Sequence, residues 1–292
     1  MAMKSIVCLV IGFDHEQTAV ETAIHLAKVN AAELRIIHVS FPVYSYSGFF
    51  GEAIMVGGGW DGIVEKQAES RLRHAREMSK RLCAKHGLPH NEAEPRIGEA
   101  HAAFSVLENR SNGDLVREMS LCDLLVIGAE KGASDVSDNS ISGLALFSTG
   151  RPLLIVRPKA DGVEPAWAGR KCALAWTHSP EAIRAVLSAR DLMENAEEVH
   201  VLVTADRNRP LDAHENTVVM DYLAQHGVKA TIHAVDREGM SPAEAVLGQV
   251  RALGCDFLIM GAYGHSVFRE MLFGGFTSYM MEEAEMPIVL AH

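Results

Sequence analysis

Short apolar runs alternate with amphipathic stretches along the 292 residues of the chain. In the second half the runs KCALAW, EVHVLV, VKATIHAV, DFLIMG and MPIVLA are short and apolar on both faces, as is typical of buried parallel strands. Stretches of helical periodicity separate them and begin near Pro180, Asp212, Ser241 and Gly275. The first and third of these stretches start with serine followed by proline, a common helix start. The pattern predicts the element order βαβαβαβαβ.

The first half of the chain repeats this order from Lys4 to Arg157. CDLLVIGAEKG from Cys122 is echoed by CDFLIMGAYGH from Cys255, and both halves end alike, in RPLLIVRP and MPIVLAH. Because such self-similarity decides architecture, we predict two tandem domains, residues 1–158 and 170–292. Residues 159–169 contain proline and glycine without periodicity and are predicted to form the linker.

The spacing between matching motifs falls along the chain, which locates an insertion in the first half. ELRIIHV from Glu33 matches EVHVLV from Glu198, and LCAKHGL around His86 matches LAQHGV around His226. The stretch between the two motifs is longer in the first half, so the extra residues lie before His86. Residues 41–63, rich in glycine and aromatic side chains, are predicted to form a long loop. It is a lid, a surface for a partner or a simple cover, and the sequence leaves these alternatives open.

Five strands with intervening helices predict an α/β fold in each half. The simplest arrangement is an open five-stranded parallel sheet in the order 3-2-1-4-5, with right-handed crossovers and helices on both faces, giving two doubly wound domains. Strands one and four then lie side by side, and a ligand crevice is expected at their carboxyl ends.

Composition and charge exclude several classes of protein. No apolar run reaches the roughly 18 residues of a membrane helix, so we expect a soluble protein that does not bind membranes. A net charge of −11 repels phosphate backbones, which argues against nucleic-acid binding. Five cysteines without Cys-x-x-Cys spacing indicate reduced thiols and a cytoplasmic protein.

The segment GAYGHSVFREMLFGGFTSYMM after the fourth strand of the second half carries the candidate chemistry. Gly261 and Gly264 allow the backbone to turn tightly and bring bare amides close to a phosphate, and Gly274 and Gly275 open a helix whose first amides attract an anion. Thr277 is placed to add a hydroxyl. The alternative is that these glycines form only the tight turn that a doubly wound fold needs.

This segment resembles the universal stress protein family, whose nucleotide-binding members carry Gly-x-x-Gly, nine residues and then Gly-Ser or Gly-Thr here. KCALAWTHSPEAIRAV and MPIVLAH resemble the first and last elements of the family, so the resemblance covers nearly the whole second half. It implies ATP or a related adenine nucleotide (ADP or AMP), with or without Mg²⁺, as ligand, and a cytoplasmic role in the stress response. It also implies dimers, which a tandem chain can imitate as an intramolecular pseudo-dimer, with further homodimerisation optional.

Residue by residue, Gly261, Gly264 and Gly274 match the motif of the family, and His265 follows the second glycine, where a side chain can face phosphate. Gly275 departs from the motif because it lacks the hydroxyl of Ser or Thr. Thr177 is a second departure, because nucleotide-binding relatives often have Asp at the end of strand one. We therefore expect weak binding at a site formed by these residues together with Thr277.

In the first half the corresponding segment is GAEKGASDVSDNSISG. Its first glycine pair is stretched to Gly128 and Gly132, and carboxylates stand where phosphates would lie, at Glu130, Asp135 and Asp138. Because carboxylates repel triphosphate, we predict that the first half binds no ATP and serves as a structural partner domain.

Other catalytic and metal-binding motifs fail when their spacing is tested. There is no P-loop lysine and no Gly-x-Ser-x-Gly nucleophile elbow. His86 and His90 are four residues apart, but Gly87 and Pro89 break the helix that would put both on one face. We predict no catalytic residues, no metal site and no efficient catalysis. Two alternatives remain: an interaction module that uses residues 41–63, and a hydrolase that uses His265 or Glu270.

Overall fold

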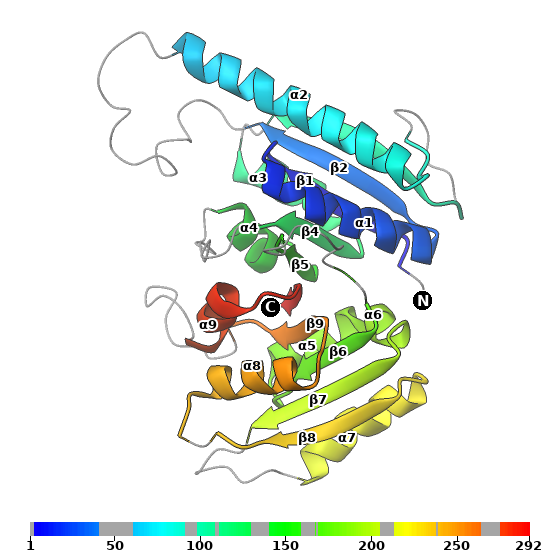
Figure 1. Cartoon of the computed structure of the whole chain (residues 1–292), viewed down its shortest axis with the longest axis vertical. Helices are drawn as coiled ribbons and strands as arrows, with labels where there is room; N and C mark the ends of the chain where they lie inside the picture. The colour runs from blue at the N-terminus through cyan, green and yellow to red at the C-terminus, as the bar shows by residue number, and fades with distance from the viewer. Residues whose placement is uncertain are drawn as a thin grey trace. The chain divides into compact units, whose positions relative to one another are not determined.

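The computed structural model describes residues 3–40, 61–90, 98–108, 111–129, 140–158, 167, 169–204, 213–237, 239–263 and 275–292. They divide into two compact units, one spanning Met3–Gly128 and the other Ala129–His292 (Figure 1). The last helix and strand of the first sequence repeat therefore cluster with the second repeat. Within the predicted linker, Trp167 is buried, and its ring centroid lies 4.5 Å from that of Phe257.

The first unit contains four parallel strands in the order β3-β2-β1-β4. Its strands are β1 (Ser5–Val10), β2 (Glu33–Ser40), β3 (His101–Glu108) and β4 (Leu124–Gly128), and its helices are a short 3-10 turn (Asp14–Glu16), α1 (Gln17–Asn30), α2 (Asp61–Lys85) and α3 (Asn112–Ser120). Residues 41–60 of the predicted loop lie outside the described residues. The prediction was wrong for residues 61–63, which belong to α2.

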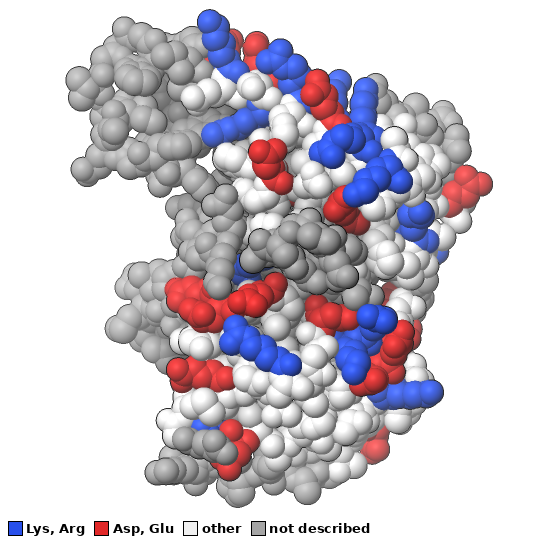
Figure 2. Space-filling model, viewed as in Figure 1, with Lys and Arg blue, Asp and Glu red and all other residues white. Residues whose placement is uncertain are grey.

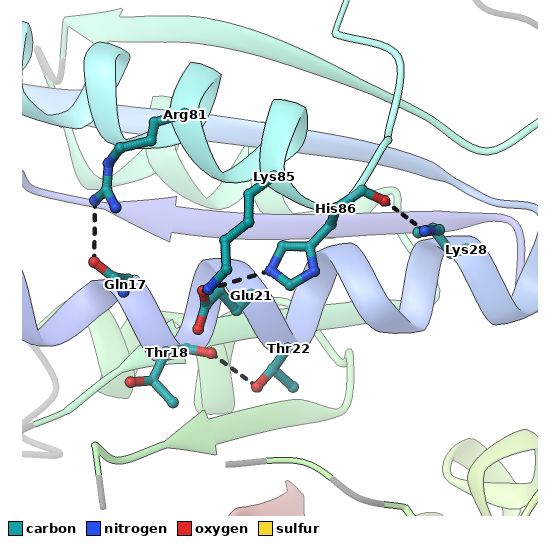
Figure 3. Close-up of polar contacts among 8 residues, drawn as sticks. All are labelled: Gln17, Thr18, Glu21, Thr22, Lys28, Arg81, Lys85 and His86. Carbon is teal, nitrogen blue, oxygen red and sulfur yellow. Dashed lines mark hydrogen bonds and ion pairs between the residues drawn. The ribbon is translucent and has the colours of Figure 1, made fainter. Parts of the chain in front are cut away.

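Helix α2 is held against α1 by polar contacts near its C-terminal end (Figure 3). Arg81 Nη2 donates to Gln17 Oε1 at 3.0 Å, and Lys85 Nζ lies 2.8 Å from Glu21 Oε1. His86 Nε2 lies 3.4 Å from the same carboxylate oxygen. Burial tends to raise the pKa of Glu21, but these two partners outweigh it and lower the pKa. His86 thus serves an interhelical contact.

The second unit contains β5 (Leu153–Val156), β6 (Lys171–Ala175), β7 (Glu198–Thr204), β8 (Ala230–Val235), β9 (Phe257–Gly261) and β10 (Ile288–Ala291). They pair in the order β5-β10-β9-β6-β7-β8, all parallel except β5 with β10. Its helices are α4 (Ile141–Ser148), α5 (Pro180–Ser188), α6 (Arg190–Glu194), α7 (Ala213–Gln225), α8 (Pro242–Ala252) and α9 (Gly275–Glu283). The predicted α/β class is confirmed. The expectation that every strand is buried on both faces was wrong for β8, an edge strand whose Ile232 is 38% exposed.

Two of the repeated sequence motifs have a plain structural cause. Asp123 accepts hydrogen bonds from the amides of Lys4 and Ser5, and its counterpart Asp256 accepts from Arg170 and Lys171, so each aspartate holds the start of the first strand of its repeat. Gly87 and Gly227 both have positive φ, 63° and 73°, two residues after the ends of α2 and α7. Glycine ends each helix there because other residues meet a steric clash in that conformation.

The five cysteines are all buried and free. Within the described part of the chain, no helix is long and apolar enough to cross a membrane. Figure 2 shows Lys and Arg side chains grouped over α2, whose sequence carries more basic than acidic residues although the whole chain is acidic.

Candidate functional site

The candidate site lies where β6 and β9 end side by side in the second unit, with Ala175 paired to Met260. Gly261, the last residue of β9, packs directly against the first turn of α5. A β-carbon there would lie 2.6 Å from Ala182 N and 2.9 Å from Glu181 Cβ. The helix therefore requires glycine at this position whether or not a ligand binds.

The turn after β6 leads into the capped start of α5. Ser179 Oγ accepts from Ala182 N at 3.2 Å and caps α5. In the preceding turn the amides of Thr177 and His178 donate to no group among the residues that the structure describes. Both residues are exposed. Two unused donors at the carboxyl end of a central strand form a place for an anion or another hydrogen-bond acceptor.

The chain turns sharply after β9. Tyr263 has a φ of 58°, and its amide donates to Thr277 Oγ1 at 3.4 Å. Thr277 is only 3% exposed, and its side-chain oxygen supports the turn from the buried side. Gly275 is exposed, and a β-carbon there would meet no described residue within 4 Å beside the first turn of α9. Gly264, His265 and Gly274 lie outside the described residues.

Two polar side chains near the site were not singled out by the sequence. Glu181 Oε2 and Ser278 Oγ are buried, and neither has a hydrogen-bond partner among the described residues. The other oxygen of Glu181 lies 3.6 Å from Arg184 Nη1. A polar atom that is buried without a partner is unusual and costs stability. The spacing that matches ELRIIHV with EVHVLV also pairs Glu16 with Glu181. The sequence could therefore have shown that the two glutamates correspond, but not how either side chain is oriented.

In the first unit, the backbone amides of the corresponding turn, after β1, are occupied by a side chain of the same unit. The amides of Ile11, Gly12 and Phe13 follow β1 and all donate to the carboxylate of Glu16, at 2.8, 2.8 and 2.9 Å. Glu16 is 3% exposed. Burial raises its pKa, and the three amide hydrogen bonds oppose that rise. Because both carboxylate oxygens accept, the geometry fits the ionised form.

Helix α2 covers this turn. It has 25 residues against 13 in α7, so α2 has additional turns at its N-terminal end. Arg71, in these turns, places its guanidinium 4.6 Å from the centre of the Phe13 ring. Gly12 has a φ of 101°, and a β-carbon on it would lie 2.4 Å from Arg71 O. The predicted acidic residues Glu130, Asp135 and Asp138, and Gly132, lie outside the described residues.

Candidate metal ligands do not gather in the part of the chain that the structure describes. Its residues contain no group of three His, Cys, Asp or Glu side chains that could hold a metal ion. His200 and His233 lie 3.0 Å apart, ring nitrogen to ring nitrogen, on β7 and β8. At that distance the two nitrogens share a hydrogen bond.

Comparison with known proteins agrees with this picture. The model of the Universal stress protein family matches residues 170–292, as the resemblance predicts. A universal stress protein from Archaeoglobus fulgidus DSM 4304 is similar in structure, with a TM-score of 0.67 and 14% identity over 98% of this chain and 96% of that chain. A protein from Pseudomonas aeruginosa UCBPP-PA14 assigned to the same family gives a TM-score of 0.54 and 13% identity over 99% and 93%. At these identities the similarity shows the fold. No curated protein matches the chain.

Proposed function

We propose, from the membership of residues 170–292 in the universal stress protein family, that this repeat binds an adenine nucleotide: ATP, or the related ADP or AMP. The proposed place is the turn at the carboxyl ends of β6 and β9. The observation that carries the proposal is the pair of amides at Thr177 and His178, which have no acceptor among the described residues; the exposed start of α9 at Gly275 supports it. Backbone amides and a helix N-terminus together favour a phosphate-bearing ligand.

The contrast between the repeats supports this assignment. In the first repeat the matching amides of Gly12 and Phe13 donate to Glu16. In the second, the amides of Thr177 and His178 donate to no group among the described residues. Glu181 Oε2 and Ser278 Oγ, which have no partner among the described residues, add an acceptor and a hydroxyl on the helices that follow β6 and β9. Thr177 supplies no carboxylate for the ribose, so the binding we propose is weak.

The protein acts, in this proposal, in the cytoplasm as a stress-response protein that senses or carries the nucleotide without hydrolysing it efficiently. Mg²⁺ accompanies the phosphates as part of the ligand. The antiparallel pairing of β5 with β10 joins the end of the first repeat to the end of the second, and we propose that it makes the chain an intramolecular pseudo-dimer. The first repeat then contributes structure and no nucleotide site.

The test is to denature the purified protein, identify any released nucleotide by chromatography, and follow the thermal stability of stripped protein as ATP and Mg²⁺ are added. A ligand at 100 times its dissociation constant stabilises the native state by about 2.7 kcal/mol. The variant Gly264→Asp should abolish the rise in melting temperature because it brings a carboxylate into the glycine motif. The matched control is Gly132→Asp in the first repeat, which should leave the rise unchanged.

Absence of both a released nucleotide and a thermal shift would refute the proposal. An equal loss in both variants would also refute it, because the effect would then not belong to the second repeat. In either case the alternative of an interaction module using residues 41–63 takes its place.

A further inference from the structure

The first repeat contributes side chains to the immediate surroundings of the candidate site in the second. They come from α4 and β5, which belong to the second compact unit although they end the first sequence repeat. We propose that Arg157 and Phe147 are positioning residues of the nucleotide site in the second repeat. This inference rests on the function proposed above.

Arg157 holds the far end of α9. It directly follows β5 and is 2% exposed, and its guanidinium donates to Ala284 O at 3.1 Å and also to Met281 O. The last carbonyls of a helix lack partners within the helix, and a cation there also interacts favourably with the helix dipole. Burial lowers the pKa of Arg157, but a guanidinium stays charged in proteins. A buried arginine bound to these carbonyls fixes where α9 ends.

Strand pairing explains how Arg157 reaches this place. β5 and β10 are antiparallel, with Ile155 opposite Ile288. Extending that register past β5 brings Arg157 to the start of β10, which the chain enters shortly after α9 ends at Glu283. The antiparallel arrangement therefore delivers the end of the first repeat to the end of α9.

The same pairing brings the end of β10 to α4. The ring of His292 meets Phe147 edge-on at 5.0 Å, and His292 Nδ1 lies 3.1 Å from Ala262 O. Phe147 also packs against Tyr263, with 5.2 Å between ring centroids. Tyr263 occupies the sharp turn after β9, and its amide donates to Thr277 in α9. Phe147 is thus the first-repeat contact of the turn that leads into the glycine motif.

Together these contacts fix the candidate site from two sides. Helix α9 has nine residues and is about 13 Å long. We expect so short a helix to move as one body, so that a shift at the end held by Arg157 also moves its first residue, Gly275. Loss of the guanidinium leaves the carbonyls of Ala284 and Met281 without this donor and allows α9 to shift. Loss of the Phe147 ring frees Tyr263. Either change lowers the fraction of molecules whose amides stand ready for a ligand.

The experiment uses the full chain with Arg157→Met, which removes the donors but keeps much of the volume, and Arg157→Lys, which keeps the charge. Two quantities are measured: amide hydrogen exchange over residues 275–284 without ligand, and the ATP dissociation constant. We expect exchange in α9 to rise and ATP to bind about tenfold more weakly in Arg157→Met, because two charged hydrogen bonds are lost. Arg157→Lys should fall between, and Phe147→Leu should weaken ATP binding by a smaller factor.

Arg251→Met is the matched control. Arg251, in α8, is exposed and donates to Glu283 O at 3.1 Å. The variant Arg251→Met therefore removes an arginine from the same end of α9 without leaving a buried site empty. It should change both quantities little.

The outcomes separate the two proposals. Unchanged exchange in α9 of folded Arg157→Met overturns the role of Arg157. Raised exchange with unchanged ATP affinity reduces Arg157 to a structural residue and overturns its positioning role. A wild-type protein that binds no ATP overturns the proposed function and the positioning role with it, whereas the exchange data still decide whether Arg157 holds α9.

Discussion

Replacing Glu16 with alanine should destabilise the first repeat by about 3 kcal/mol. The substitution leaves the amides of Ile11, Gly12 and Phe13 without the acceptor that each has at 2.8 to 2.9 Å. A hydrogen bond to a charged group contributes about 1.5–3 kcal/mol, and an unsatisfied buried donor costs about 1–3 kcal/mol. If all three amides lost their hydrogen bonds at full cost, the destabilisation would exceed about 3 kcal/mol. We expect the smaller value because water can enter the space left by the side chain and solvate part of the loop.

Glu16→Gln refines the prediction. Glutamine keeps one acceptor oxygen and replaces the other with a donor, which faces amides that also donate. We expect a loss of about 1–2 kcal/mol, smaller than for alanine because at least one amide keeps its partner. A simple helix cap would behave differently, since capping of the short helix Asp14–Glu16 explains only the bond to Phe13.

The assay is urea unfolding at neutral pH, with the free energy of unfolding taken from the midpoint and slope. Formate, which is a small carboxylate, is then added to the wild type and to Glu16→Ala. If the three amides form an anion site, formate should raise the midpoint of Glu16→Ala more than that of the wild type, with saturation. A matched control is Glu69→Ala, at an exposed position of α2. A loss below about 0.5 kcal/mol in Glu16→Ala, the size expected of a plain surface change, would refute the reasoning.

Three further predictions follow from burial and from the open end of β6. Burial and the nearby charge of Arg71 lower the pKa of His38 from 6.5 to about 4, so the unfolded chain binds this proton at higher pH than the native state. Stability should therefore fall as the pH drops from 6.5 towards 4, and His38→Phe should flatten this slope in urea titrations; an unchanged slope would contradict the assignment. Thr177→Asp should tighten ATP binding by roughly threefold to tenfold, because it adds an acceptor for ribose hydroxyls, and calorimetry showing weaker binding would argue against ribose at this turn. Burial raises the pKa of Cys83 and Cys255 to about 11, so a thiol reagent at pH 8 should react with them only as the protein unfolds; fast reaction of native protein would disprove their burial.

The sequence by itself determined the elements and their repetition. Strands of the second half follow the apolar runs, and α5 and α8 begin at Pro180 and Pro242 as the serine–proline pairs predict. These features are local: periodicity, caps and glycines at helix ends act within a few residues, so their information is complete in a short window. The glycine motif was visible for the same reason, and Gly261 does stand at the end of β9.

Only the tertiary structure decided which atoms meet. The sequence predicted no ATP in the first repeat because of acidic residues in its glycine loop, which lie outside the described residues; the structure adds that Glu16 occupies the amides after β1 and that α2 covers them. Thr277 was predicted to add a hydroxyl to the site, and the structure adds that its oxygen accepts from the amide of Tyr263, a contact that the sequence did not indicate. The sequence placed Arg157 only at the end of the first repeat, and its bonds to α9 depend on the antiparallel register of β5 and β10. Such contacts join segments that lie far apart in the sequence, and a side chain's partner there is set by packing and strand register, which no local pattern encodes.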